Sequence, residues 1–512
     1  MNRFYLTTPI YYVNGAPHIG HAYTSIAADV LARWKRLDGF EVFFLTGTDE
    51  HGQKVEKAAA EAGLDSQSFT DRVANDFRAM AAAMGISNDD FIRTTEARHK
   101  RACVALWERL IANDAIYLGH YEGWYAVRDE AFYGEDELIQ KPDGTRLAPT
   151  GAPVEWVREP SYFFRLSAWQ EKLLAFYEQN PDFIAPIARR NEVLSFVRGG
   201  LTDLSVSRTS FRWGIPVPHD PAHVMYVWLD ALTNYITAAG FPDEADPRWR
   251  FWPADLHIVG KEIVRFHAIY WPAMLMAAGI APPRRIYSHG WWTVEGEKMS
   301  KSLGNVIDPR ALVAEFGLDP LRYFLLREVP FGNDGDFSRR ALITRLNGEL
   351  ANDLGNLAQR TLSLVARNCD GLRPEKGTRI AADQALLAAS GALADLLRER
   401  LARLAFHEAL EEVWKTIRAA NAYIDHQAPW ALRKTDPARM AVVLRVLLEA
   451  LRGIATVLQP FMPGSMARML DQLAVPADAR SLAALAEDLP AGVPLPAPSG
   501  IFPRVIEPAG QG

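Results

Sequence analysis

The chain has 512 residues, of which 49% are hydrophobic and 23% are charged, and its formal net charge is −6 at pH 7. This length is too great for one hydrophobic core, so we expect two to four domains. The composition is ordinary for a soluble globular protein, and no apolar run is long enough to span a membrane. The acidic net charge excludes a uniformly basic nucleic-acid-binding surface, so any RNA would have to bind through local patches.

Cysteine usage limits the chemistry further. Only Cys103 and Cys369 are present, and they lie in separate regions of the chain. Two isolated cysteines exclude a disulfide framework and a four-cysteine zinc site, and they are typical of a reducing compartment. No signal-peptide pattern precedes the first apolar run, so we expect a cytoplasmic protein. Cys103 lies in an apolar helical pattern and is expected in the core.

The first part of the chain alternates short apolar runs with helical spacing. Residues 3–9 and 42–47 are predicted to be buried strands, separated by a helix from about Tyr23 to Asp38. Apolar strands joined by a helix favour a parallel sheet with a right-handed crossover.

A histidine motif, Pro17-His18-Ile19-Gly20-His21, follows the first strand. A strand, a tight turn and a helix N-terminus present free backbone N–H groups to a phosphate. His18 and His21 share a face of a first helical turn, and both can donate hydrogen bonds to charge that develops on a phosphate. Gly20 has no side chain, so a planar base can lie close to the backbone. The alternative is an ordinary turn with two surface histidines.

A lysine motif, Lys298-Met299-Ser300-Lys301-Ser302, lies far downstream in a polar, glycine-flanked loop. Lys298 and Lys301 lie on either side of Ser300 and can form a cationic clamp for a leaving pyrophosphate. The commoner alternative is a solvated lysine loop.

Other polar residues fall at the ends of predicted strands. Asp49 follows the second strand, Gly260 and His289 end two later strands, and Glu262 comes shortly after Gly260. In open parallel sheets the ligand lies outside the carboxyl ends of the strands, so we expect these residues to converge with the histidine motif. Asp49 alone would serve equally well as a helix N-cap.

The amino-acid composition of the chain changes after the first half of the predicted sheet. Aromatic and turn residues are dense from 117 to 223, which indicates an insertion with short strands and some helices. The sheet is predicted to resume at 224–231 and to continue with strands at 256–260 and 286–290. After about residue 337 the pattern is almost wholly helical, as in a bundle, and proline and alanine beyond 475 indicate a loosely packed tail.

In this order, the two motifs resemble the HIGH and KMSKS signatures of class I aminoacyl-tRNA synthetases, and neither departs from the family pattern. Three further segments resemble the methionyl-tRNA synthetases, and this resemblance extends to about residue 475. The segments are Pro9-Ile10-Tyr11-Tyr12-Val13-Asn14-Gly15, Tyr226-Val227-Trp228-Leu229-Asp230-Ala231 with Tyr235, and Gln427-Ala428-Pro429-Trp430 with Asn352, Asn356 and Arg360. The resemblance implies ATP-dependent attachment of methionine to tRNA(Met) through a methionyl-adenylate.

The resemblance also implies a fold, namely an α/β protein with a Rossmann-like parallel-sheet catalytic domain, an inserted α+β connective domain and a following all-α helical bundle. The predicted domains are 1–116 and 224–295 for the two catalytic halves, 117–223 for the connective domain near the tRNA acceptor end, 296–338 for the KMSKS loop and stem-contact region, 339–475 for the helical anticodon-binding domain, and 476–512 for the tail.

The residues that contact methionine follow from the same resemblance, and the other site residues from their chemistry and position. Methionine is expected to contact Ile10, Tyr12, Trp228, Ala231, Tyr235 and His267, with Asp49 pairing with its ammonium group. ATP is expected at Gly20, Gly260, Glu262, His289, Lys298, Ser300 and Lys301, with His18 and His21 at its α- and β-phosphates. A thioether packs well against aromatic edges, which agrees with this pocket. Taken singly, each aromatic residue would be interpreted as core packing.

The anticodon CAU is expected to contact Asn352, Asn356, Arg360 and Trp430, because a tryptophan face can stack an unpaired base and the polar groups can read its edges. Without the two signatures, Trp430 would be interpreted as a buried bundle residue.

The chain also departs from relatives in this family. Many methionyl enzymes carry a four-cysteine zinc knuckle in the insertion, and since those cysteines do not exist here, we predict no structural zinc and no other metal site. The insertion is too short for the editing domain of isoleucyl, valyl or leucyl enzymes. No carboxy-terminal dimerisation module follows the bundle, so we expect a monomer. The expected partners are methionine, ATP with Mg²⁺, and initiator and elongator tRNA(Met), without a membrane.

Three other interpretations stay open from the residues. A cysteinyl synthetase shares both signatures but grips its substrate with a cysteine-ligated zinc. A nucleotidyltransferase or ligase could form an adenylate without tRNA, against which the helical domain argues. A non-enzymatic tRNA-binding paralogue would be expected to have broken signatures, whereas both are intact here.

Overall fold

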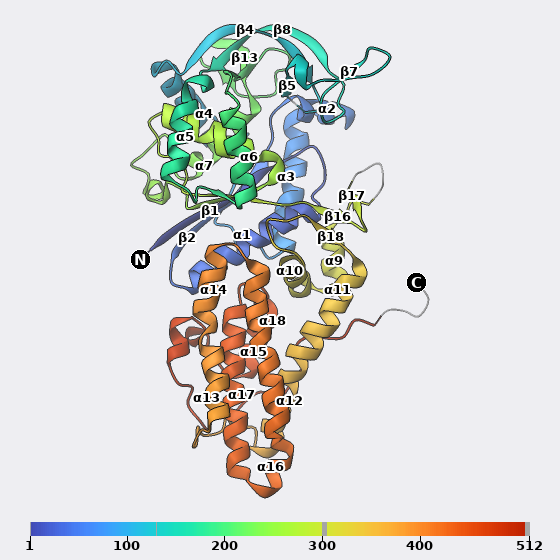
Figure 1. The fold of residues 1–512 in the computed structure, drawn as a ribbon, viewed down its shortest axis with the longest axis vertical. Helices are drawn as coiled ribbons and strands as arrows, with labels where there is room; N and C mark the ends of the chain where they lie inside the picture. The colour runs from blue at the N-terminus through green and yellow to red at the C-terminus, as the bar shows by residue number, and fades with distance from the viewer. Residues whose placement is uncertain (1, 130, 300–304, 507–512) are drawn as a thin grey trace.

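A sheet of six parallel strands forms the centre of the upper half of the molecule, in the order β3-β2-β1-β14-β15-β9 (Figure 1). The computed structural model describes residues 2–129, 131–299 and 305–506. The strands are β1 (Arg3–Tyr12), β2 (Glu41–Asp49), β3 (Asp90–Arg93), β9 (Ile184–Ala185), β14 (Leu256–Gly260) and β15 (Ile286–His289). The sheet extends in opposite directions from β1, which pairs in parallel with both β2 and β14. Such a switch point opens a crevice at the carboxyl ends of the strands.

Helices connect and flank these strands. They are α1 (Ile19–Leu37), α2 (Gln53–Glu61), α3 (Ser66–Ala83), α4 (Ala97–Ala112), α7 (Val227–Ala238) and α8 (Trp271–Ala277). Of these, α1 and α7 pack directly on the sheet. Helix α1 begins at Ile19, four residues earlier than the predicted start at Tyr23. The reason is local, because the side chain of His18 accepts a hydrogen bond from the backbone of Gly20 and caps the helix. The second half of the histidine motif is therefore the first helical turn.

Residues 224–231, at which the sequence predicts that the sheet resumes, do not enter it. Strand β13 (Asp220–Met225) belongs to a separate three-stranded sheet with β11 (Ser207–Arg208) and β12 (Pro216–Val217). The chain then forms helix α7, in which all residues except Trp228 are buried. An apolar run buried on every side has no period by which a helix can be told from a strand. The sixth strand of the main sheet, β9, comes instead from the predicted insertion.

The insertion forms the top of the molecule in Figure 1. Its long antiparallel pair is β4 (Ile116–Ala126) and β8 (Glu155–Phe164), flanked by β5 (Ala131–Tyr133) and β10 (Leu204–Ser205). Helices α5 (Gln170–Gln179) and α6 (Ile187–Arg198) follow, in agreement with the helices predicted in the insertion.

The helical half forms the lower part of Figure 1. A small sheet of β16 (Trp292–Val294), β17 (Glu297–Lys298) and β18 (Gly335–Phe337), with α9 (Pro309–Phe316) and α10 (Leu318–Arg327), joins it to the catalytic half. The helices that follow are α11 (Arg339–Arg345), the π-helical segment η6 (Leu346–Gly355), α12 (Asn356–Asn368), α13 (Ala381–Gly391), α14 (Leu393–Ala402), α15 (Phe406–Gln427), α16 (Pro429–Thr435), α17 (Pro437–Leu458) and α18 (Pro463–Gln472). Among the residues described, no helix is both long and apolar enough to cross a membrane.

The sequence predicts a loosely packed tail beyond residue 475, and this prediction is wrong for the part of the tail that the structure describes. Arg445 donates to the carbonyl of Leu489, and Arg452 donates to the carbonyl of Glu487. Ile501 is buried and belongs to the main hydrophobic core. Hydrogen bonds from arginine side chains to backbone carbonyls hold the tail. Because such bonds do not depend on the side chains of the tail, its sequence shows no hydrophobic period.

Candidate active site

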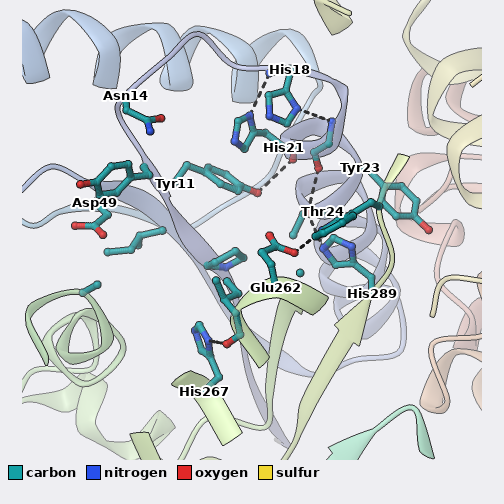
Figure 2. Close-up of a pocket in the computed structure, with 18 of the residues that line it drawn as sticks. Tyr11, Asn14, His18, His21, Tyr23, Thr24, Asp49, Glu262, His267 and His289 are labelled. Atoms are coloured by element: carbon teal, nitrogen blue, oxygen red, sulfur yellow. Dashed lines mark hydrogen bonds between the residues drawn. The ribbon is translucent and has the colours of Figure 1, made fainter. Parts of the chain in front are cut away.

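A cavity of about 520 Å³ opens at the carboxyl ends of β1, β2, β14 and β15 (Figure 2). Almost all residues predicted to bind methionine or ATP line it, namely Ile10, Tyr12, His18, Gly20, His21, Asp49, Trp228, Ala231, Tyr235, Gly260, Glu262, His267 and His289. Their positions in sequence span both halves of the sheet. The parallel topology brings them together because the carboxyl ends of the strands share one edge.

The two histidines of the first motif lie face to face at one side of the cavity, with ring centroids 3.9 Å apart. The backbone N–H of Gly20 donates to Nδ1 of His18, and the N–H of His18 donates to Nδ1 of His21, each at 3.1 Å. Burial lowers the pKa of His18 and takes the pKa of His21 well below its ordinary value, so both rings are neutral at pH 7. Because each Nδ1 accepts, each proton sits on Nε2, and both rings can donate a hydrogen bond to a ligand.

Gly20 lies close against this pair. A Cβ atom at this position would come within 2.9 Å of Cε1 of His18. A side chain here would require the ring of His18 to shift, so glycine suits this position in the first turn of α1.

The opposite side of the cavity is aromatic. The ring of Trp228 stacks on Phe266 at 3.7 Å and 9°. Nδ1 of His267 donates to the carbonyl of Ile263 at 2.9 Å, so its Nε2 accepts from the hydroxyl of Tyr235 at 2.7 Å. Burial lowers the pKa of His267 to about 4, which keeps the ring neutral. The resulting pocket has an apolar lining and a fixed hydroxyl oxygen.

His267 lies on the π-helical turn η5 (Phe266–Tyr270). Such turns occur often at functional sites. No pattern in the sequence predicts this turn.

Asp49 ends β2 beside Tyr12 and is buried at the edge of the cavity. Helix α2 is capped by Gly52 with no side-chain hydrogen bond, so Asp49 is not its N-cap. Asp49 instead lines the same cavity as the two histidines, on the side of Tyr11 and Asn14 (Figure 2). A cationic group of a ligand would be favoured there.

The third side of the cavity is formed by β14, β15 and α1. Nδ1 of His289 donates to the carbonyl of Gly290, so its Nε2 accepts from the hydroxyl of Thr24 at 2.8 Å. The indole N–H of Trp291 donates to Glu262 at 2.6 Å. Gly260 leaves room for that carboxylate, because a Cβ there would lie 2.4 Å from Glu262 Oε1.

Thr24 and Trp291 also line this side, although neither belongs to a motif recognised in the sequence. The available signal for Trp291 is its position two residues after His289, at the end of a strand.

The lysine motif is only partly described. The backbone of Lys298 pairs with Thr293 in the small sheet, and Met299 lines the cavity. The side chain of Lys298, and all of Ser300 and Lys301, lie outside the described residues.

The four predicted anticodon residues lie on η6, α12 and α16 of the bundle, and two of them, Arg360 and Trp430, are in contact. Asn352 lies on η6, while Asn356 and Arg360 follow on α12. The guanidinium of Arg360 lies 5.4 Å from the ring centre of Trp430, and it also pairs with Asp425. Trp430 is 44% exposed, so it is not the buried bundle residue of the alternative interpretation. It lies on α16, at the lower tip of the molecule (Figure 1).

Two family models match almost the whole chain. A model described as "tRNA synthetases class I (M)" matches residues 4–362, and one described as "Anticodon binding domain of methionyl tRNA ligase" matches residues 373–510. The chain belongs to the methionyl-tRNA synthetase family. The second match takes in most of the tail as well as the bundle, in agreement with the packing of the two.

Curated relatives of this family match over nearly their full length. A methionine–tRNA ligase from Mesorhizobium japonicum is 56% identical over 99% of both chains, and one from Rickettsia felis is 58% identical over 98% of both. The chain is accordingly an enzyme of this class, which joins methionine to tRNA with ATP.

Solved structures of the family have the same fold. The methionyl-tRNA synthetase of Mycobacterium tuberculosis in complex with methionyl-adenylate is 54% identical and superposes with a TM-score of 0.96 over 98% of this chain and 100% of that one. The free form of the same protein gives a TM-score of 0.90, over 99% of each chain. The fold of this chain is therefore similar to both, with the higher score for the adenylate complex.

Proposed function

We propose that the cavity forms methionyl-adenylate and then transfers methionine to tRNA(Met). In the first step, a methionine carboxylate oxygen attacks the α-phosphorus of ATP, and the bond to the β-phosphate breaks to release pyrophosphate. In the second, the 2′-hydroxyl of the terminal adenosine attacks the adenylate carbonyl, and AMP leaves. The observation that carries the proposal is the convergence of neutral histidines, an aromatic pocket and Asp49 on one cavity.

For ATP, we assign His18 and His21 to the α- and β-phosphates. Their Nε2–H groups support this role, because fixed donors stabilise charge that develops during phosphoryl transfer. Gly20 would lie against adenine, Glu262 would bind the ribose, and Gly260 and His289 would contact the nucleotide. Lys298, Ser300 and Lys301 are proposed for the leaving pyrophosphate on the strength of their motif alone.

For methionine, Asp49 would pair with the ammonium group. The side chain would lie against Trp228, Ala231 and Tyr235, with Ile10, Tyr12 and His267 completing the pocket. Stacking of Trp228 on Phe266 supports a rigid aromatic wall, against which a thioether sulfur packs well.

For tRNA, we assign Asn352, Asn356, Arg360 and Trp430 to the CAU anticodon, which initiator and elongator tRNA(Met) share. The exposed ring of Trp430 beside the guanidinium of Arg360 supports stacking with an unpaired base.

We further propose a cytoplasmic monomer that uses ATP as its Mg²⁺ complex and holds no structural zinc. The absence of a four-cysteine knuckle from the sequence supports the last point. The presence of ATP and tRNA in the cytoplasm supports the proposed location.

Two variants test the site. Lys301→Ala should lower the rate of adenylate formation on the order of a hundredfold while methionine binding is retained. Trp228→Ala should raise the KM for methionine far more than the KM for ATP. If Lys301→Ala formed the adenylate at a rate within about threefold of the wild type, the assignment of Lys301 to the pyrophosphate would be wrong. Equal effects of Trp228→Ala on both KM values would make Trp228 a core residue only.

A further inference from the structure

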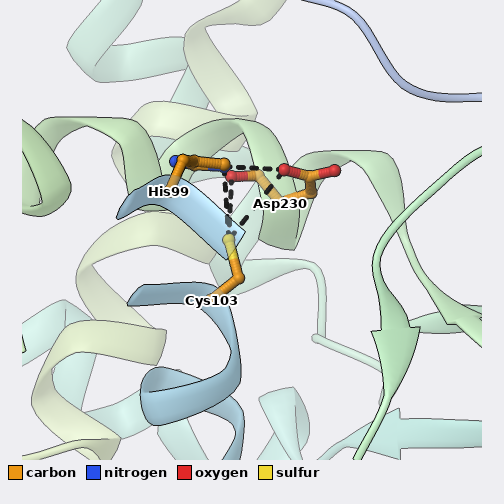
Figure 3. A group of neighbouring side chains, drawn as sticks. All are labelled: His99, Cys103 and Asp230. Atoms are coloured by element: carbon orange, nitrogen blue, oxygen red, sulfur yellow. Dashed lines mark hydrogen bonds and ion pairs between the residues drawn. The ribbon is translucent and has the colours of Figure 1, made fainter. Parts of the chain in front are cut away.

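A buried polar cluster lies behind the methionine pocket, on the side of α7 away from the cavity. Figure 3 shows three of its members, His99, Cys103 and Asp230. One carboxylate oxygen of Asp230 accepts from Nε2 of His99 at 2.7 Å, and the other accepts from Nδ1 of His51 at 2.7 Å. No member of the cluster is more than 2% exposed. A carboxylate buried so completely is costly unless both oxygens are hydrogen-bonded, as they are here.

The charge of Asp230 depends on these two histidines. Burial by itself raises the pKa of the carboxyl, but His51 and His99 more than offset this effect and bring it down to about 2. The group is therefore an ion at neutral pH, and it binds both imidazoles through charge-assisted hydrogen bonds, the stronger kind.

The cluster joins α4 to two elements that also build the methionine pocket, the end of β2 and α7. His51 comes two residues after Asp49 in the chain segment that leaves β2. Asp230 lies on α7, between Trp228 and Ala231 of the pocket. His99 is in the first turn of α4, and its Nδ1 lies 3.2 Å from the hydroxyl of Thr237, two turns further along α7. The cluster thus fixes α7 against the end of β2.

An ion-binding site is the other interpretation of His99, Cys103 and Asp230, whose ligand atoms lie within 4.8 Å of one another. The 2.7 Å between Nε2 of His99 and Asp230 Oδ1 is the distance of a direct hydrogen bond. Both carboxylate oxygens are already used by imidazole N–H groups. The geometry therefore favours a hydrogen-bonded network over a metal site.

We propose that His51, Asp230 and His99 are positioning residues for methionine. The network sets the distance between Asp49, which would bind the ammonium group, and the aromatic wall on α7, which would bind the side chain. Because methionine would be bound at both ends, a small change in that distance would weaken its binding. This inference rests on the proposed function of the cavity.

The test uses methionine-dependent ATP–pyrophosphate exchange without tRNA. His51→Leu and His99→Leu remove one donor each, whereas His51→Asn and His99→Gln put an amide N–H close to the original nitrogen. The matched control is His223→Leu, since His223 is also a buried histidine, bonded to Ser207 in the insertion. We expect the two network leucine variants to raise the KM for methionine on the order of tenfold and to leave the KM for ATP nearly unchanged. The amide variants should recover most of this loss.

A purely structural role would move both KM values together, or would lower only the fraction of folded enzyme, and either result would overturn the proposal. So would a failure of the amide variants to do better than the leucine variants. If the wild type bound one equivalent of zinc and His99→Leu did not, the cluster would be a metal site and not a hydrogen-bonded network. If the wild type gave no methionine-dependent exchange, the proposed function itself would be wrong. Because this result concerns the wild type and not the variants, it can be told apart from a failure of the network proposal.

Discussion

The guanidinium of Arg322 lies 2.6 Å from a carboxylate oxygen of Asp29, and neither side chain is exposed to solvent. The same guanidinium donates to the carbonyls of Met84, Pro460 and Phe461. Asp29 is on α1, the helix whose first turn carries Gly20 and His21, and residues 460–461 lead into α18 of the bundle. One side chain on α10 thus ties the catalytic helix to the anticodon-binding half.

The first prediction concerns this pair. Arg322→Met should lower the free energy of unfolding by about 3–5 kcal/mol, because it leaves the buried carboxylate of Asp29 without its main partner. The double variant Asp29→Asn with Arg322→Met should be more stable than Arg322→Met alone. Urea unfolding followed by tryptophan fluorescence measures both. Equal stability of Arg322→Met and the wild type would show that the ion pair adds nothing to the domain junction.

A second prediction concerns Trp291, whose indole N–H holds Glu262. Trp291→Phe keeps the ring but loses this donor, so Glu262 should bind the ATP ribose less well. We expect the preference of the enzyme for ATP over 2′-deoxy-ATP to fall on the order of tenfold in pyrophosphate exchange. Trp252→Phe is the matched control, because its indole N–H donates to Ala281 instead. An unchanged preference in Trp291→Phe would remove Trp291, and with it Glu262, from the ribose site.

The anticodon assignment gives a third prediction. Trp430→Ala should reduce kcat/KM for tRNA(Met) charging about tenfold to a hundredfold, since stacking of one base contributes about 1–3 kcal/mol. Pyrophosphate exchange without tRNA should not change, because Trp430 lies at the far tip of the bundle. Ile380→Ala provides the control, as Ile380 is a bundle residue of nearly equal exposure, 45% against 44%. Equal losses in the two variants would contradict base stacking on Trp430.

Acid sensitivity is the fourth prediction. Because burial lowers the pKa of His267 to about 4, the folded protein keeps this ring neutral where the unfolded chain is protonated. Its contribution to stability is therefore complete above the ordinary pKa of about 6.5 and is lost as the pH falls from there towards 4. Between pH 7.5 and 5.0, the wild type should lose about 2 kcal/mol more unfolding free energy than His267→Gln. An equal loss in both proteins would show that His267 is not held neutral.

Much of the central sheet and cavity could be predicted from the sequence. Strands such as β2 and β14 are continuous apolar runs, and polar residues at their carboxyl ends, such as Asp49 and Glu262, must meet in a parallel sheet. The start of α1 was harder to predict, because it depends on a cap formed by the ring of His18. Helix α7 is buried on almost every side, so the apolar run at its start does not distinguish a helix from a strand.

Other features depend on contacts that a linear pattern does not contain. Helix α16 has only seven residues, too few to show a helical period, yet it exposes Trp430. The tail is held by Arg445 and Arg452 through backbone carbonyls, which any residue type supplies. The link between Asp230 and its two histidines joins residues that are 179 and 131 positions apart. No local rule predicts such a contact.

The most direct test is ATP–pyrophosphate exchange without tRNA, measured separately with each of the twenty amino acids. The assignment of the cavity to methionyl-adenylate formation predicts exchange with methionine far above all other amino acids. Exchange with a different amino acid would keep the two-step chemistry but contradict the pocket of Trp228, Tyr235 and His267. Exchange with none of the twenty would contradict tRNA-independent adenylate formation in this cavity.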